Sequence, residues 1–198
     1  VGDIDVDDVE KKIKKIFKGI KKDKNAAERI YYPVSDNEEM IFAQGTDKEQ
    51  KNYALQIYFK HDATPRELVN TKEEIYKNFV RGIAMALLNN RFTEISVKEN
   101  PPFLGAAVSN GSFILSSTKD AFSVSVMCKT DKINEALPFA FCEVERARRF
   151  GFTDSELARR KASMLAGTEK RYAERSKISN DDYVNDYVSH FLNNTSAM

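Results

Sequence analysis

The sequence predicts an α+β domain with a mostly antiparallel sheet and helices packed on one face. Strand-like and helix-like stretches are grouped along the chain instead of alternating one by one. Such grouping is typical of antiparallel sheets with helices on one side. At 198 residues the chain is also long enough for one domain with a sizeable core, and little is left for a second.

Composition narrows the class of protein further. Hydrophobic residues make up 41% and charged residues 31% of the chain, a balance typical of folded domains. A net charge of +1 gives no general attraction to phosphate, so we expect no nucleic-acid partner. No apolar run approaches the length that a membrane-spanning helix needs. Cys128 and Cys142 form no CxxC motif, and we expect two buried thiols.

An amphipathic helix is predicted near the start of the chain. Asp5 can cap it, and Val9, Ile13 and Phe17 recur at helical spacing, while lysines fill the opposite face. Acidic residues offset those lysines, which favours a solvated helix face. The lysines are nevertheless the one feature on which nucleic-acid binding could rest. The polar residues that follow, 21–28, are predicted to be a linker.

The rest of the chain reads as strands and helices with clear start and stop signals. Capping boxes at Thr71 with Glu74 and at Thr153 with Glu156 mark two helix starts. Asn89-Asn90 indicates a helix end. The predicted strands are 29–32, 40–44, 53–60, 104–115 and 121–128, and the predicted helices are 71–90, 91–98, 131–150, 153 to about 176, and from about 181.

A search for catalytic motifs finds none. The chain has two histidines, His61 and His190, and neither lies in an HExxH or HxxEH motif. The glycines are scattered, with no nucleophile elbow or phosphate-binding loop. We therefore expect that the chain holds no metal and hydrolyses nothing by itself.

Several segments together resemble a known family. These are Val1-Gly2-Asp3-Ile4-Asp5 with the helix after it, Leu88-Asn89-Asn90-Arg91-Phe92 followed by Lys98-Glu99, and Gly151-Phe152-Thr153-Asp154-Ser155-Glu156-Leu157. Their order and spacing resemble the insulinase/pitrilysin-type zinc metallopeptidases, which carry an inverted HxxEH motif. The resemblance covers nearly the whole chain and implies an insulinase-like α/β sandwich module.

The resemblance implies a division of labour between modules. In that family the zinc ligands lie in a catalytic module, upstream of the strand that Val1-Gly2-Asp3-Ile4-Asp5 resembles. Residues 1–24 would then be the closing strand and helix of the preceding catalytic module plus a linker, and 25–198 a single non-catalytic domain. Zinc would belong to the parent enzyme and not to this chain. The implied partners are the catalytic module and a peptide substrate, whose chamber this domain would help to wall.

Two positions follow from the resemblance alone. In related modules an Arg and a Tyr reach the substrate, and Ser96 and Phe103 stand at those positions here. Serine carries no fixed charge and phenylalanine has no hydroxyl, so these substrate-contact positions depart from the family pattern. The alternative hypothesis is a stand-alone α+β protein-interaction module, which an HxxEH motif encoded upstream would argue against.

Overall fold

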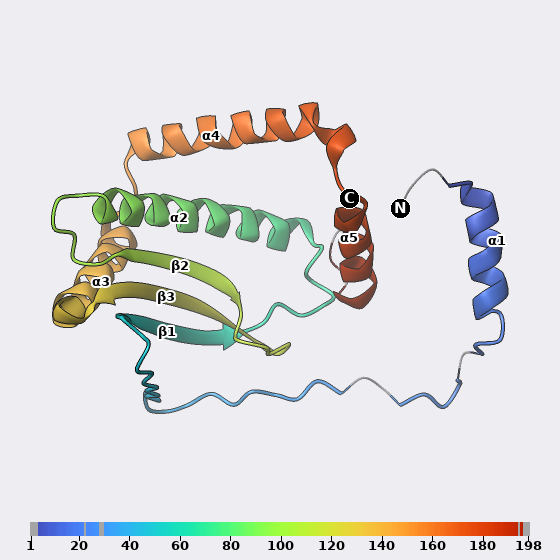
Figure 1. Ribbon diagram of the computed structural model, residues 1–198, viewed down its shortest axis with the longest axis horizontal. Helices are drawn as coiled ribbons and strands as arrows, with labels where there is room; N and C mark the ends of the chain where they lie inside the picture. The colour runs from blue at the N-terminus through green and yellow to red at the C-terminus, as the bar shows by residue number, and fades with distance from the viewer. Residues whose placement is uncertain (1–3, 22, 28–29, 194, 196–198) are drawn as a thin grey trace.

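The computed structural model describes residues 4–21, 23–27, 30–193 and 195. The strands and helices are arranged as shown in Figure 1. They are, in chain order, α1 (Val6–Phe17), β1 (Asn52–Asp62), α2 (Lys72–Ser96), β2 (Gly105–Ser112), β3 (Lys119–Lys129), α3 (Ile133–Phe150), α4 (Asp154–Ala173) and α5 (Asn180–Asn193), with short 3-10 turns at Thr130–Lys132 and Arg175–Lys177.

The sheet is antiparallel throughout, as predicted. Its strand order is β1-β3-β2, so β3 is the central strand (Figure 1). Pairing with β1 is residue for residue from Asn52 opposite Lys129 to Asp62 opposite Lys119. Along β2 it runs from Gly105 opposite Met127 to Ser112 opposite Asp120. Because β3 is paired along both edges, its alternating side chains define the two faces of the whole sheet.

One face of the sheet carries the hydrophobic core. The even-numbered residues of β3 from Val124 to Cys128 are buried there, against α2 and α3. Phe92 of α2 and Ala136 and Ala140 of α3 reach 0% exposure in this cluster. The prediction of helices packed on one face is therefore confirmed, since both helices share a single core with the same side of β3.

Helix α2 is longer than predicted. Its N-cap is Thr71, whose side chain accepts a hydrogen bond from the Glu74 N–H. The reciprocal bond of the predicted capping box is not formed, because the Thr71 N–H donates to the Leu68 carbonyl. The predicted break at Asn89-Asn90 is wrong, because the helix continues to Ser96. The Asn89 side chain donates to the Val108 carbonyl at 3.0 Å and accepts from the Val108 N–H at 2.8 Å. Its amide thus bonds the edge of β2 and leaves the helix backbone intact.

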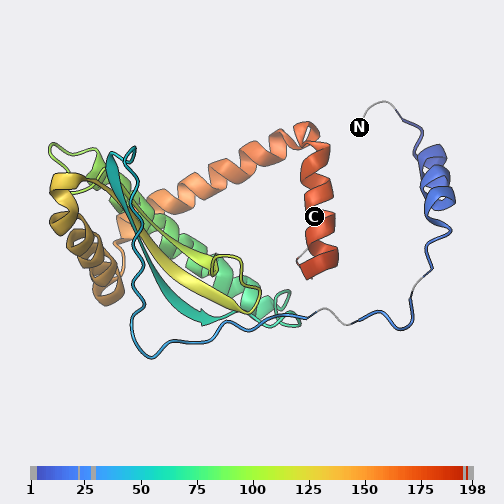
Figure 2. The same ribbon diagram turned by 60° about the horizontal axis from the view of Figure 1, so that its bottom comes forward.

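Helix α4 is attached to the body mainly at its first turn. The capping box of Thr153 and Glu156 is formed, and Arg91 of α2 donates to both Glu156 carboxylate oxygens at 2.6 and 2.8 Å. Arg91 also donates to the carbonyl of Gly151, whose φ of 68° ends α3. From there α4 diverges from the sheet (Figure 2). None of the residues of α4 is buried, which confirms the prediction of a largely exposed helix.

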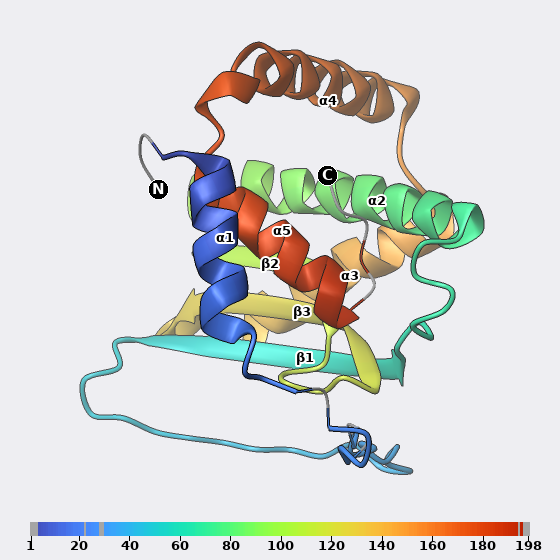
Figure 3. The ribbon, with the colours of Figure 1, turned by 90° about the vertical axis from the view of Figure 1, so that its right-hand side faces the viewer.

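The segment between α1 and β1 differs from prediction. Residues 30–32 and 40–44, predicted as strands, form no strand in the described structure, and Arg29 lies outside the described residues. The strand expected from the resemblance at the start of the chain cannot be compared, because Val1-Gly2-Asp3 also lies outside the described residues. The segment passes alongside β1 without joining its edge (Figure 3). Strand propensity alone therefore does not pair this segment with the open edge of β1.

The pair of Arg91 and Glu156 should make stability depend on pH. The hydrogen bond from Arg91 lowers the pKa of Glu156 to about 2. A depressed carboxylate pKa stabilises the fold above the unfolded value of about 4.3, and that contribution is lost as pH falls toward the folded value. We expect Glu156→Gln to lower the free energy of unfolding by about 1–3 kcal/mol at pH 7, with the difference from wild type shrinking between pH 4.5 and 2 in urea titrations.

Glu145→Gln is the matched control. The pKa of Glu145 is also lowered to about 2, by hydrogen bonds from Arg148 and then Arg149. That carboxylate is 42% exposed, so solvent screens its pairs and the stability should change little. Equal losses for both variants at pH 7 would contradict the role given to Arg91.

Candidate functional site

From here on we call the whole segment between α1 and β1 the linker. Its residues 30–36 meet the turn between β2 and β3, residues 113–118, at one end of the sheet, and we call this place the linker junction. The Val34 N–H donates to the Thr118 hydroxyl at 3.3 Å, and that hydroxyl donates to the Tyr32 carbonyl at 3.4 Å. Lys60 of β1 donates to the Ser35 carbonyl at 2.7 Å. The linker backbone is thus held on the sheet by the side chains of Thr118 and Lys60.

A single lysine completes this attachment. Lys119, the first residue of β3, bonds Asp62 at 2.7 Å and Asp36 at 2.9 Å. Its side chain is 10% exposed while both carboxylates are open to solvent. Hydrogen bonds to Asp62 and then Asp36 raise the pKa of Lys119, and the bond from Lys119 lowers the pKa of Asp36. Lys119 remains charged and ties the linker to β1 and β3 together.

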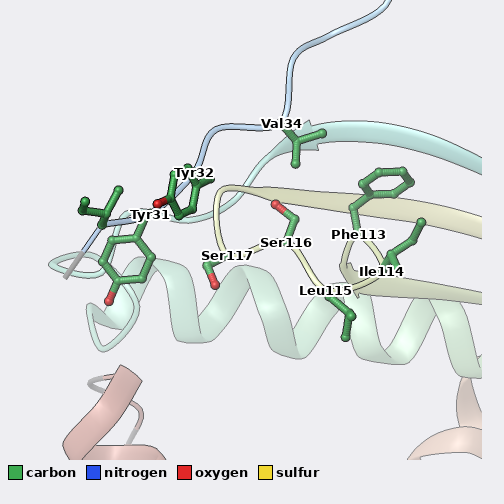
Figure 4. Close-up of a pocket in the computed structure, with 9 residues that line it drawn as sticks. Tyr31, Tyr32, Val34, Phe113, Ile114, Leu115, Ser116 and Ser117 are labelled. Carbon is green, nitrogen blue, oxygen red and sulfur yellow. The ribbon is translucent and has the colours of Figure 1, made fainter.

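An apolar hollow of about 460 Å³ opens at the linker junction (Figure 4). Ile114 and Leu115 at the tip of the turn are 65% and 94% exposed, and Ile114 has a positive φ of 53°. The residues around the hollow are Ile30, Tyr31, Tyr32, Val34, Phe113, Ile114, Leu115, Ser116 and Ser117. Their polar atoms are hydroxyl and backbone groups, so the hollow suits contact with an apolar side chain of a partner better than acid–base chemistry.

The sheet face away from α2 and α3 is largely polar, and Ser123 at its centre is only 5% exposed. The hydroxyls of Ser109 and Ser123 lie 2.7 Å apart on it, beside Ser125 of β3. Gln56 and Tyr58 of β1 extend the same face and are exposed. The hydroxyl and amide groups on this face present donors and acceptors beside the larger side chains of Tyr58 and Met127.

Helix α1 stands apart from the body, in front of α5 when seen from the side of the N-terminus (Figure 3). The Asp5 cap is formed, with its side chain accepting from the Asp8 N–H at 2.9 Å, so the predicted start is confirmed. Ile13, Ile16 and Phe17 are 51%, 72% and 56% exposed. A helix with one strongly apolar face is stable chiefly when that face is packed against something.

The two positions named from the resemblance lie in different surroundings. The Phe103 ring is 1% exposed and packs edge-on against Phe92 and Phe139, with centroids 5.9 and 6.1 Å away. Ser96 ends α2 and its hydroxyl donates to the Thr93 carbonyl at 2.9 Å. Both side chains are occupied by contacts within the domain, and a role of either in substrate contact stays a prediction.

The histidines do not fit a zinc site. His61 Nδ1 donates to the Asp62 carbonyl, and Nε2 lies 3.0 Å from the side-chain oxygen of Asn110. His190 Nδ1 donates to the Thr195 carbonyl. Within the described part of the chain, no three His, Cys, Asp or Glu side chains gather as a metal site would require. None of the described helices is both long and apolar enough to cross a membrane.

The linker junction was missed by the sequence analysis. Asp36 and Asp62 are 83 and 57 residues away from Lys119 in sequence, so no local pattern connects them. Charged side chains in turns are ordinarily predicted to be exposed to solvent. The apolar run Phe113-Ile114-Leu115 next to Ser116-Ser117 was a usable signal, because large apolar residues are unusual at a turn. It was read instead as the end of a strand.

Most of the sequence matches a described family. Residues 1–164 match the model of the "Peptidase M16 inactive domain". Among curated proteins, "Zinc protease PQQL-like" from Arabidopsis thaliana is 23% identical over 161 residues, which is 81% of this chain and 13% of that protein. The chain therefore spans a small part of the length of this relative.

Solved structures share the fold. The crystal structure of the periplasmic protease PqqL from Escherichia coli superposes with a TM-score of 0.83 at 20% identity, over 100% of this chain and 21% of that one. The structure titled "Predicted insulinase family protease from Yersinia pestis" gives a TM-score of 0.77 at 13% identity, over 100% of this chain and 42% of that one. The predicted resemblance and fold class are confirmed.

The contrast between Phe103 and Ser96 can be measured. Phe103→Ala should lower the free energy of unfolding by about 3–5 kcal/mol, because a buried ring is lost from the contact of α2 and α3. Ser96→Ala removes one hydroxyl at a helix end and should change it by less than about 0.5 kcal/mol. Urea denaturation of both variants tests this, and a Phe103→Ala variant as stable as wild type would contradict the core position.

The attachment at Lys119 can be tested separately. Lys119→Met removes both ion pairs, and we expect faster hydrogen exchange at the Val34 amide because the linker loses its tie to the sheet. Lys132→Met is the control, since Lys132 pairs with Glu135 on α3, away from the linker. Unchanged exchange at Val34 in Lys119→Met would show that the backbone bonds alone hold the linker.

Proposed function

Because the chain belongs to the peptidase M16 inactive-domain family, we propose that it is the non-catalytic domain of a zinc metalloprotease and lies next to the catalytic module. The observation that carries this proposal is the family match over residues 1–164 in a sequence whose two histidines form no zinc motif. The parent protein would hydrolyse peptide bonds, and its zinc would be held by residues of the catalytic module.

The domain's first role in this proposal is to wall the substrate chamber. Its sheet face away from α2 and α3 supports this, because the exposed side chains of Gln56, Tyr58 and Ser109 can form hydrogen bonds there. An unfolded peptide has free backbone donors and acceptors along its length, and such a face can satisfy them without demanding one sequence. The helices α2 and α3 would then lie on the outer side of that wall.

The second role is to hold the catalytic module in place. Residues 1–24 would be the closing strand and helix of that module plus a linker, so the exposed Ile13, Ile16 and Phe17 of α1 would pack within it. The linker junction lies where this linker joins the sheet. Its exposed Ile114 and Leu115 would contact the module from the side of residues 25–198, a single domain in this proposal.

The domain would contribute no group to the chemical step. Ser96 and Phe103 stand at positions where relatives are expected to use a charged and a hydroxyl side chain. The Phe103 ring is enclosed by Phe92 and Phe139, and a phenyl ring has no proton to donate to a developing oxyanion. The contribution of this domain to catalysis would therefore be one of shape and position.

Metal analysis and a peptidase assay test the proposal together. We expect the isolated chain to bind no stoichiometric zinc and to cleave no peptide in an unstructured substrate mixture, while the full parent protein does both. Stoichiometric zinc in the isolated chain that is lost in His61→Ala or His190→Ala would overturn the proposal. A full parent protein without zinc or peptidase activity would overturn it as well.

A further inference from the structure

Residues 40–44, which we call the exposed segment, have an unusual environment for their composition. Met40, Ile41 and Phe42 are consecutive large apolar residues, and they are 87%, 75% and 78% exposed. Within the described part of the chain, residues 40–44 make no backbone hydrogen bond. Both their side chains and their backbone groups are therefore available to a partner.

The composition of the exposed segment fits a strand that is covered on both faces. Consecutive side chains of an extended chain point to opposite sides, so Ile41 lies opposite Met40 and Phe42. Strands with an unbroken apolar run are found where both faces of a sheet are buried. The sheet of this chain is covered on one face only, and the other face carries Ser123 and Gln56. If the exposed segment paired with β1, some of its three apolar side chains would therefore remain exposed to water.

The position of the exposed segment is imposed from both ends. Asp36 is held by Lys119 near the Asp62 end of β1, and β1 begins at its other end with Asn52. The intervening residues must return along the length of β1, about 35 Å for its 11 residues, and Figure 3 shows them doing so away from its edge. The structure thus presents an extended apolar segment at a fixed place, unpaired.

We propose that the exposed segment is an interface strand that joins an open sheet edge of the neighbouring catalytic module. This rests on the proposed function, which supplies that module. The module is the favoured partner because α1 and the linker connect it directly to residues 30–36, so the two surfaces meet at high effective concentration. Backbone pairing along a strand edge would then supply the contact, with Met40 and Phe42 on one face and Ile41 on the other.

Hydrogen exchange measured on the full parent protein and on residues 1–198 tests this directly. Because alternate amides of a strand point to one edge, we expect the amides of Ile41 and Ala43 to exchange at least about 100-fold more slowly in the parent than in the isolated chain. Equal, fast exchange in both would overturn the proposal. Protection already present in the isolated chain would overturn it too, since it would mean pairing with β1 or with a second copy.

Two proline variants sharpen the test. Ile41→Pro removes one backbone donor from the exposed segment. Lys48→Pro is the control, because Lys48 lies in a turn whose hydrogen bonds run from the Gln50 N–H to the Asp47 carbonyl and from the Glu49 N–H to the Asp47 side chain. The Lys48 N–H takes part in neither bond. We expect Ile41→Pro to abolish the protection in the parent and Lys48→Pro to preserve it. Protection that survives in Ile41→Pro contradicts the proposal.

The result is separable from the proposed function. A zinc-containing, active parent whose exposed segment exchanges freely would overturn the interface strand and leave the proposed function standing. An inactive, zinc-free parent would overturn the proposed function by the peptidase assay, whatever the exchange rates. In the isolated chain, both proline variants should keep the wild-type melting temperature, because the segment is unpaired there.

Discussion

The pairing of β3 along both edges is the constraint on which the rest of the domain depends. Its 11 residues are matched one for one by β1, so the alternation of its side chains fixes the two faces of the sheet. Val124, Val126 and Cys128 face the helices, while Ser123 and Ser125 face the other way. A slip of one residue would exchange these sets, and α2 and α3 would meet a polar surface.

Polar interactions secure the parts that this core does not reach. The Arg91 guanidinium lies 4.7 Å from the Phe152 ring centroid and bonds Glu156 with two N–H groups, which fixes the start of α4 on α2. Lys119 does the same for the linker. Both cations are mostly shielded from solvent, at 15% and 10% side-chain exposure, and shielded multidentate pairs are geometrically specific. Helix α4 and the linker are thus positioned with little apolar burial.

Large apolar side chains are exposed on several elements, including Phe79 of α2 and Phe191 of α5. Three of these places adjoin the linker: α1, the tip of the β2–β3 turn and the exposed segment. Each contains large side chains that are more than half exposed, among them Ile16, Leu115 and Met40. Contiguous apolar surface of this kind marks interaction sites in soluble proteins. All three are connected by the linker, which favours a domain built to contact one neighbouring module over a stand-alone interaction module.

The sequence by itself determined the fold class, the capped helix starts and the absence of a zinc motif, because these depend on periodicity, local hydrogen bonds and residue types. The tertiary structure alone decided three other features. Asn89 bonds the edge of β2 instead of ending α2, Lys119 joins residues far apart in sequence, and residues 40–44 stay unpaired despite their strand propensity. In each case the outcome depends on which groups the tertiary fold brings within hydrogen-bonding distance. Residues that are neighbours in sequence do not determine which distant groups those are.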